Sequence, residues 1–405
     1  MPPQTVHQVV TSPPYWGLRD YGVSGQLGLE PTPEEYTSNM VALFAEVHRV
    51  LRDDGTLWLN LGDTYATGAG KCRNPGSDAK PRNGHEGKQT YVNDFPQQQP
   101  NRMPIPGLKP KDLVGIPWRI AFALQTAGWY LRDCIIWHKP NPMPGSMTDR
   151  TCTSHEYIFL LSKSRRYYFD QVAIAEKAVS GAKGSVFHAG KTGVSQERCC
   201  DKPRDDYETR NPRSVWTIAS KSYKEAHFAT YPIALPIRCI KAGTSERGCC
   251  PACGAPWIRM TSKVRQATRP GTNTKVKVPS NWATGSVPHT ATAHNTAEGR
   301  TAAATLPKHD RGYASGAVPG KHPTQFGNRD PERHVTTVKT TGWNAGCRCE
   351  DHEPVPCTVL DPFNGAASTG VAALKCGHNY IGIDLNPDYL ELSERRLRPF
   401  REVLF

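Results

Sequence analysis

Apolar residues recur every three to four positions through the segment PEEYTSNMVALFAEVHRVLRDDG, residues 33–55. This spacing places one apolar face on an amphipathic helix, which we expect Asp-Asp-Gly to end. The unbroken apolar run TLWLNLG that follows predicts a buried strand, and HQVVT at residues 7–11 predicts a strand before the helix. Residues 1–65 therefore predict strand, loop, helix and strand.

The alternation continues further along the chain. VGIPWRIAFALQTAGW predicts a helix with Pro near its start and Gly at its end, and YLRDCIIWHKPN predicts a strand that runs into a polar loop. Further strands are expected over 157–161 and 167–169, and HFATYPIALPIRCIKAGT resumes a helical pattern. The C-terminal stretch, residues 357–397, predicts strand, glycine-containing turn, helix, strand and helix. The whole pattern is typical of an α/β fold with a βαβ unit at its C-terminal end.

Three segments lack apolar periodicity: residues 66–112, 171–215 and 260–345. They are polar, basic or rich in Gly, Pro, Thr and Ala, so we expect inserts and loops rather than core. The predicted division is an N-terminal half with a flexible insert, a basic polar region, a helical segment, a Cys-rich basic insert and a C-terminal βαβ unit. Their boundaries are 1–170 with the insert 66–112, 171–215, 216–248, 249–350 and 351–405.

The charge, the apolar runs and the cysteine content of the chain limit the classes of function that it can have. Fifty Lys and Arg against 37 Asp and Glu give a formal charge of +13, which favours a polyanionic partner such as nucleic acid. No apolar run approaches the ~20 residues of a membrane span, and the start MPPQTVHQ does not resemble a signal peptide. Thirteen Cys without such a signal indicate a reducing compartment, so we expect a cytoplasmic protein without a membrane partner.

The C-terminal turn indicates a ligand site. In TVLDPFNGAASTG a strand runs into a turn of small residues and then a helix, so backbone N–H groups can approach a ligand there. Asp384 follows Gly365 by 19 positions, near the ~20 expected of a carboxylate that accepts ribose hydroxyls. The glycine pattern of a pyrophosphate site is missing, and Asp361 and Phe363 suit a cationic or apolar cofactor better.

A second motif, TSPPYWG, stands directly after the first predicted strand. Two prolines stop both a helix and a sheet ladder, so they hold the backbone rigid where Tyr15 and Trp16 follow. Taken alone, the motif is either a site or a proline-stiffened turn that happens to carry aromatic residues.

Together, TSPPYWG and LDPFNGAASTG resemble the amino-group DNA methyltransferases that use S-adenosylmethionine. The order of the two motifs is similar to that of the permuted β-type group, which implies a catalytic half at 1–170, a target-recognition region at 171–215 and a cofactor-binding unit at 351–405. The resemblance implies a Rossmann-like fold with a mixed, mainly parallel and circularly permuted sheet, to which we add a zinc-tied insert. It assigns catalysis to Ser12, Pro13, Pro14 and Tyr15, and cofactor binding to Asp361, Pro362, Phe363, Asn364, Gly365, Asp384 and Thr230. Ala367 replaces the second glycine of the family motif, a change that we expect cofactor binding to survive.

The chemistry explains the residue types. An exocyclic amine is a poor nucleophile unless two acceptors hold its hydrogens and turn its lone pair toward the methyl group. The Ser12 hydroxyl and the Pro13 carbonyl supply such acceptors, and Tyr15, helped by Trp16, offers a stacking face for a flipped base. In the family that the motifs resemble, Ser at the first motif position goes mostly with N4 of cytosine, so the resemblance implies that base; N6 of adenine, or a DNA-binding relative without turnover, are the alternatives.

Cysteines suggest a metal site. Cys250 and Cys253 form a C-x₂-C knuckle, and Cys347 and Cys349 lie beyond the 260–345 insert. Four thiolates would close a structural Zn²⁺ site and tie the ends of the insert together, with Cys249 and His352 as substitute ligands. The alternative is a set of reduced thiols.

The expected partner is double-stranded DNA with a flipped base, and a cognate restriction nuclease would fit a restriction-modification pair. Basic residues of the 171–215 region, including Arg204 and Arg210, are the first candidates for DNA contact, and the 260–345 insert is the second. Lys139 and Asn141 follow a core strand and are expected at the phosphates. The alternative for such runs is a solvated basic loop. Recognition sequence and oligomeric state stay open.

Overall fold

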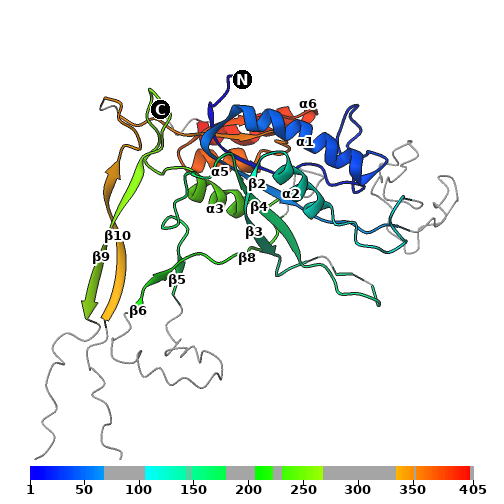
Figure 1. Cartoon of the computed structure of the whole chain (residues 1–405), viewed down its shortest axis with the longest axis horizontal. Coiled ribbons are helices and arrows are strands. Elements are labelled where there is room, and N and C mark those ends of the chain that lie inside the picture. The colour runs from blue at the N-terminus through cyan, green and yellow to red at the C-terminus, as the bar shows by residue number, and fades with distance from the viewer. Residues whose placement is uncertain are drawn as a thin grey trace, which may run out of the picture. The chain divides into compact units, whose positions relative to one another are not determined.

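The structure is a computed structural model that describes residues 1–67, 105–142, 144–145, 147–178, 206–221, 230–267, 334–350 and 353–401. The helices within these ranges are α1 (Pro33–Val50), α2 (Ile116–Thr126), α3 (Ala234–Gly243), α5 (Ser368–Lys375) and α6 (Pro387–Arg401). The strands are β1 (Val6–Thr11), β2 (Leu51–Leu61), β3 (Tyr130–His138), β4 (His155–Ser162), β5 (Glu176–Lys177), β6 (Asp206–Tyr207), β7 (Thr209–Arg210), β8 (Val215–Thr217), β9 (Ile258–Ala267), β10 (His334–Asn344), β11 (Thr358–Asp361) and β12 (Asn379–Gly382). Figure 1 shows their arrangement.

A seven-stranded sheet in the order β12-β11-β1-β2-β4-β3-β8 forms the centre of the fold. Neighbouring strands are parallel except at β4, which runs antiparallel to both β2 and β3. The predicted mixed, mainly parallel sheet is therefore confirmed. The strand β1 near the N-terminus lies beside β11 near the C-terminus, with Val9 opposite Leu360.

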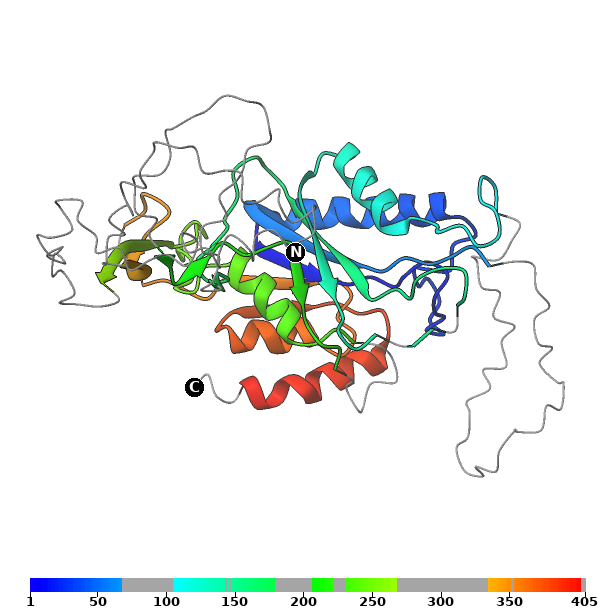
Figure 2. The same cartoon turned by 90° about the horizontal axis from the view of Figure 1, so that it is seen from below.

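Helices cover both faces of this sheet (Figure 2). One core cluster packs α1 and α2 against one face through Tyr36, Phe44 and Ile120, all fully buried. A second cluster packs α3 and α5 against the other face through Ile240 and Ala372. Since the chain leaves β1 toward β2 on one side and β11 toward β12 on the other, strand order reverses between β1 and β11. Such a reversal opens a crevice at the carboxyl ends of the strands.

Local sequence explains the helix starts. Thr32 is the N-cap of α1 and its side chain accepts from the Glu35 N–H at 3.2 Å, with Pro33 at the first helical position. The start of α2 instead uses a carboxylate from the end of β2. Asp63 Oδ1 accepts from the backbone N–H groups of Gly115 and Ile116 at 3.0 and 3.1 Å.

The chain departs from the expected elements in three places. Helix α1 ends at Val50 and β2 begins at once at Leu51, so Asp-Asp-Gly lies inside a strand rather than ending the helix. Pairing of Leu51 with Val6 of β1 extends the strand. The strand expected over 167–169 is absent from that described segment, where the Tyr168 N–H donates to the Asp54 carbonyl at 2.9 Å.

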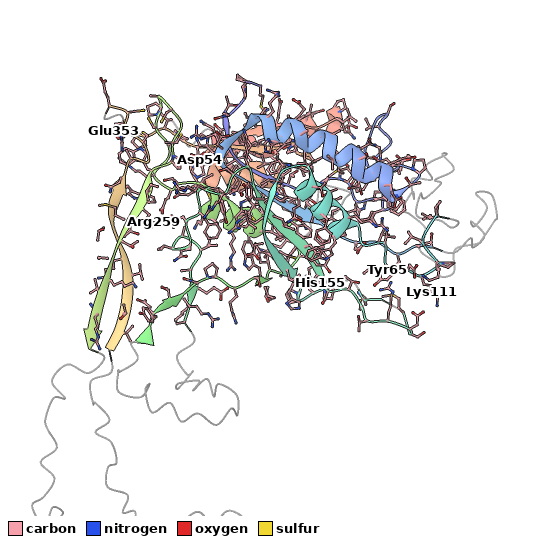
Figure 3. The ribbon with its side chains drawn as sticks, in the orientation of Figure 1. Asp54, Tyr65, Lys111, His155, Arg259 and Glu353 are labelled. Atoms are coloured by element: carbon pink, nitrogen blue, oxygen red, sulfur yellow. The ribbon has the colours of Figure 1, made fainter. Side chains whose placement is uncertain are left out.

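The third departure concerns the 260–345 insert, expected to be loop. Its two ends form β9 and β10, which make a three-stranded sheet in the order β6-β10-β9. Arg259 of β9, labelled in Figure 3, donates from Nε to Asp170 Oδ2 at 2.8 Å and from Nη1 to Thr340 Oγ1 at 2.9 Å. β10 is rich in the β-branched residues Thr and Val, which favour a strand, but the low apolar content of the whole insert concealed this signal.

The chain divides into two compact units. The first comprises Met1–Lys177, Arg210–Ser262 and Thr340–Phe405, and the second Ala178–Thr209 and Lys263–Lys339. All the side chains analysed below belong to the first unit. The ends of the predicted insert 66–112 are paired to each other there, since the Ala66 N–H donates to the Asp112 carbonyl at 2.8 Å. Residues 68–104 lie outside the described ranges.

Candidate active site

A cavity of about 910 Å³ opens at the carboxyl ends of β1 and β11. Its volume suits a ligand of cofactor size. Both sequence motifs line it, so residues about 350 positions apart face one space because their strands are adjacent and parallel. The predicted site residues along its wall are Ser12, Pro13, Pro14, Tyr15, Lys139, Thr230, Pro362, Phe363, Asn364, Gly365 and Asp384.

The loop after β1 presents two acceptors to the cavity. Within the described part of the chain, no donor reaches the carbonyl of Pro13, whereas the next carbonyl, of Pro14, accepts from the Tyr36 hydroxyl at 2.6 Å. Ser12 Oγ donates to Tyr15 Oη at 3.4 Å, a long contact, and no donor among the described residues reaches its lone pairs. The Tyr36 bond to Pro14 anchors the loop on α1.

Tyr15 is held by a carboxylate that the sequence did not single out. Its hydroxyl donates to Glu156 Oε2 of β4 at 2.8 Å. Burial, followed by the charge of Glu156, raises the pKa of Tyr15 well above its usual range, so the phenol keeps its proton. Gly62 leaves room for the ring, since a Cβ at that position would lie 2.5 Å from Tyr15 Cε2.

Asp361, at the end of β11, is a buried carboxylate at the base of the cofactor loop. Its Oδ1 accepts from the Thr11 hydroxyl at 2.6 Å and from the Phe363 N–H at 3.1 Å, and its Oδ2 accepts from the Tyr231 hydroxyl at 3.2 Å. Burial raises its pKa, and these hydrogen bonds act in the opposite direction. Asp361 is not among the cavity-lining residues, so it supports the loop from beneath. Sequence reasoning missed Tyr231.

Two further contacts shape the cofactor loop. Asp384 Oδ2 accepts from the Gly365 N–H at 2.7 Å, across the same 19-residue spacing that the sequence indicated. Asn364 Oδ1 accepts from the Tyr380 hydroxyl at 2.6 Å. Asp384 thus joins the ends of β11 and β12, while its carboxylate lines the cavity.

The chain that forms this cavity and carries its two motifs matches a known protein family. A family model described as DNA methylase, of the N6 and N4 methyltransferases, matches residues 6–250 and 258–395. The chain belongs to this family. The resemblance drawn from the two motifs is confirmed: the protein is an S-adenosylmethionine-dependent DNA methyltransferase of the amino-group class, and its substrate is DNA.

Two bacterial type II methyltransferases agree with this assignment. The DNA methylase is 45% identical to the type II methyltransferase M.SmaI of Serratia marcescens over 241 residues, which are 59% of this chain and 69% of that protein. It is 43% identical to M.Cfr9I of Citrobacter freundii over 244 residues, 60% of this chain and 68% of that protein. The solved PvuII DNA methyltransferase, named as cytosine-N4-specific, has a TM-score of 0.45 at 12% identity, covering 100% of this chain and 86% of that chain.

The position of Ala367 in the DNA methylase explains why the family motif has glycine there. Ala367 has φ of 53°, a left-handed conformation that disfavours a side chain. Its methyl group is fully buried beside Val371 and Leu397, while Ala366 and Ser368 line the cavity. The added methyl therefore points into the core.

The four predicted cysteine ligands come together. The Sγ atoms of Cys250, Cys253, Cys347 and Cys349 all lie within 4.8 Å of one another. Cys249 instead lies with His7 and Cys357 in a second group, and His352 is outside the described residues. The two cysteine pairs are about a hundred positions apart, so tertiary structure alone unites them.

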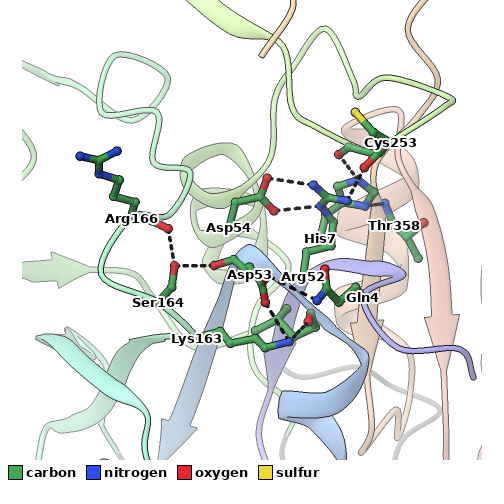
Figure 4. Close-up of polar contacts among 12 residues, drawn as sticks. Gln4, His7, Arg52, Asp53, Asp54, Lys163, Ser164, Arg166, Cys253 and Thr358 are labelled. Carbon is green, nitrogen blue, oxygen red and sulfur yellow. Dashed lines mark hydrogen bonds and ion pairs between the residues drawn. The ribbon is translucent and has the colours of Figure 1, made fainter. Parts of the chain in front are cut away.

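This knuckle is attached to the amino ends of the central strands (Figure 4). His7 of β1 accepts the Thr358 N–H on Nδ1 at 3.0 Å, which makes Nε2 the donor to the Gly254 carbonyl, also at 3.0 Å. Arg52 of β2 donates to the Cys253 carbonyl at 2.7 Å and to both Asp54 oxygens at 2.8 and 3.0 Å. These contacts tie the cysteine region to β1, β2 and β11.

One predicted DNA contact is wrong. The Trp16 ring is fully buried among the core residues next to α1, and its Nε1 donates to the Glu30 carbonyl at 2.8 Å. The aromatic pair after the prolines is therefore divided between two roles. Tyr15 lines the cavity, whereas Trp16 packs into the core and holds the loop in place. The two adjacent side chains therefore point to opposite sides of the turn.

Three of the remaining predicted DNA contacts, Lys139, Asn141 and Arg210, have partners within the protein. Lys139 pairs with Glu156 through Nζ, and Asn141 exchanges hydrogen bonds with the backbone of Ser220 at 3.2 and 3.0 Å. Arg210 pairs with Glu176 at 3.3 Å. Arg204 lies outside the described residues.

No helix in the described ranges combines the length and apolar character needed to cross a bilayer.

Proposed function

We propose that this DNA methylase transfers the methyl group of S-adenosylmethionine to the exocyclic N4 amine of a cytosine in DNA. The observation that carries the proposal is the loop after β1. It offers Ser12 Oγ and the Pro13 carbonyl as acceptors in the same cavity as the cofactor loop. An amine whose two hydrogens meet these acceptors has its lone pair directed out of the ring plane. Holding that geometry beside the methyl donor is the main catalytic effect.

The residues around the cavity fit the cofactor. The sulfonium carries a positive charge, and the wall offers the Asp384 carboxylate and the faces of Pro362 and Phe363. When bound, S-adenosylmethionine would supply an electrophilic methyl group and leave as the neutral thioether, while the methylated amine would release one proton to solvent. Asp384 would accept from its ribose hydroxyls, and Asn364, Gly365 and Thr230 would complete the contacts. The Gly365 N–H already bonded to Asp384 fixes the carboxylate before the ligand arrives.

The choice of cytosine rests on Ser12 at the first position of the motif. Adenine N6 presents the same two hydrogens to the same two acceptors, so N6-methyladenine is the competing product. Since the base must reach a cavity at the strand ends, the substrate is double-stranded DNA with the target base flipped out. Tyr15 would supply the stacking face.

Nucleoside mass spectrometry tests the base directly. DNA is incubated with the full chain and isotopically labelled S-adenosylmethionine, then digested to nucleosides, with the Ser12→Ala variant as the matched control. Label in N4-methylcytosine is the expected result. Label in N6-methyladenine would retain the mechanism and reject the choice of base, and the absence of label with cofactor bound would reject DNA methyl transfer.

We also propose that Cys250, Cys253, Cys347 and Cys349 hold a structural Zn²⁺. Four thiolates around tetrahedral zinc at ~2.3 Å stand ~3.8 Å apart, which the 4.8 Å grouping of the Sγ atoms accommodates. A site of four cysteines leaves no open coordination position, so this metal would stabilise rather than catalyse. It would join the knuckle after α3 to the segment that leads into β11.

Metal content tests this second proposal. Elemental analysis of the purified full chain should give one zinc per molecule, and the double variant Cys253→Ser/Cys347→Ser should lose it. Cys152→Ser, an exposed cysteine outside the group, is the matched control and should keep the metal. Wild-type protein without metal, with all four thiols open to a thiol reagent, would reject the site.

The wider predictions remain proposals. The permuted motif order, the recognition role of the 171–215 region and a cognate restriction nuclease follow from the family resemblance. Arg204, Arg210 and Asn141 are proposed to contact DNA, although the latter two would first have to exchange the internal partners described above. Footprinting of variants at these positions would test the assignment.

A further inference from the structure

The active-site cavity contains a charged group that the catalytic motif does not include. Glu156 lies on β4, 141 positions from Tyr15, and lines the cavity with Ser12. Three donors converge on its carboxylate from different elements. Tyr15 Oη and Asn60 Nδ2 reach Oε2 at 2.8 and 3.1 Å, and Lys139 Nζ reaches Oε1.

We infer that Glu156 is a positioning residue that sets the direction of the hydrogen bonds through Tyr15 to Ser12. The inference rests on the proposed amine methylation. A carboxylate only accepts, so the Tyr15 hydroxyl must donate its single hydrogen to Glu156. The oxygen of Tyr15 is then left as an acceptor, and the Ser12 hydroxyl donates to it at 3.4 Å. Both lone pairs of Ser12 Oγ therefore stay available for the target amine.

The opposite direction would obstruct the reaction. If Tyr15 donated to Ser12, a lone pair of Ser12 Oγ would be occupied and the amine would lose an acceptor. Ser12 would then be free to turn its own hydrogen toward the amine, which repels an N–H group. Glu156 thus acts through Tyr15 and touches neither the base nor the cofactor in this role.

Glu156 forms a largely buried ion pair with Lys139, which holds its carboxylate against the Tyr15 hydroxyl. The Glu156 side chain is 18% exposed and Lys139 is 22% exposed, so both ions are largely removed from solvent and each needs the other. Lys139 also lies over the Trp137 ring, 4.4 Å from its centroid. We therefore assign Lys139 the role of balancing the charge of Glu156, in place of the contact with DNA phosphates that the sequence predicted.

A double-mutant cycle between Glu156 and Tyr15 tests the inference on the full chain. In Glu156→Gln the side-chain amide can donate to Tyr15 and reverse the chain of hydrogen bonds. We expect kcat for methyl transfer to fall about 10- to 100-fold, while the KM for DNA and the calorimetric Kd for S-adenosylmethionine change less than about threefold. Tyr15→Phe removes the hydroxyl through which Glu156 acts. Adding Glu156→Gln to that variant should therefore lower kcat little further. Glu46→Gln, on the exposed face of α1, is the matched control.

The outcomes separate this inference from the proposed function. Unchanged kcat in Glu156→Gln, or effects that add fully with Tyr15→Phe, would overturn it while wild-type methylation stood. A loss of thermal stability and of cofactor affinity in proportion to kcat would also overturn it, because that pattern belongs to a purely structural ion pair. A wild-type protein that labels no cytosine would reject the proposed function instead.

Discussion

The amino and carboxyl ends of β1 and its neighbours β2 and β11 differ in whether their polar groups have hydrogen-bond partners. At the amino ends, both ring nitrogens of His7 are used, and Arg52 makes three hydrogen bonds (Figure 4). At the carboxyl ends, the Pro13 carbonyl has no donor among the described residues and Ser12 Oγ has one long contact. Satisfied groups stabilise a fold, while acceptors left open at a cavity are available to a ligand.

Stability and function therefore depend on opposite ends of the same strands in this DNA methylase. Variants at the amino ends should lower the free energy of unfolding and leave turnover intact. Variants at the carboxyl ends should lower turnover or cofactor affinity and leave unfolding nearly unchanged. Substitutions at Ser12, Asp384, Arg52 and Glu176 test that separation.

Ser12→Ala removes an acceptor for the target amine. We expect the single-turnover rate of methyl transfer to fall about 10²- to 10³-fold, the size typical of losing one preorganised hydrogen-bonding group. DNA affinity, cofactor affinity and unfolding should hardly change. Ser38→Ala, at an exposed position of α1, serves as control. Equal losses of turnover and DNA affinity would contradict the role given to Ser12.

Asp384→Ala should weaken S-adenosylmethionine binding about 10- to 100-fold by calorimetry, because charge-assisted hydrogen bonds contribute roughly 1.5–3 kcal/mol. The Gly365 N–H would also lose the partner that shapes the loop. At saturating cofactor the rate should recover most of its value. Asp388→Ala, an exposed carboxylate in the first turn of α6, is the matched control. Unaltered affinity would remove Asp384 from the cofactor site.

Arg52→Ala tests the amino ends. Its side chain is 15% exposed and pairs with Asp54 and the Cys253 carbonyl, so we expect the free energy of unfolding to fall by about 1–3 kcal/mol. Urea denaturation measures this, with Arg49→Ala in an exposed pair on α1 as control. Cofactor affinity and turnover of the folded variant should match wild type. A selective loss of turnover would break the separation between the two ends.

Glu176→Gln tests whether satisfied charges also stabilise β5, where Glu176 pairs with Arg210, Arg213 and Arg238. Burial raises the pKa of Glu176, but hydrogen bonds from Arg213 and Arg238 outweigh it and lower the pKa from 4.5 to about 2. A carboxyl whose folded pKa is depressed stabilises the fold above its unfolded pKa and loses that contribution as pH falls. The variant should therefore be less stable than wild type by about 1 kcal/mol at pH 7, with the gap closing between about pH 5 and pH 2. A gap independent of pH would contradict this account.

Local pattern was sufficient for much of the DNA methylase. The period of the apolar residues predicted α1, α2 and α3, because an amphipathic helix records its buried face in its own spacing. The motifs at Ser12 and Asp361 were also visible, since proline rigidity and small turn residues act over a few positions, but only the two together indicated the family. The C-x₂-C knuckle was visible for the same reason.

Other features depended on partners distant in the chain. Strand β2 starts at Leu51 because Val6 pairs with it, and Trp16 is buried because α1 covers it. Glu156 gave no local signal, since its meaning comes from three donors on separate elements. Local sequence was therefore enough to predict the helices, the two motifs and the chemistry that each motif could perform. The adjacency of β1 and β11 arises in the folded chain alone, because strand pairing joins residues that no local period relates.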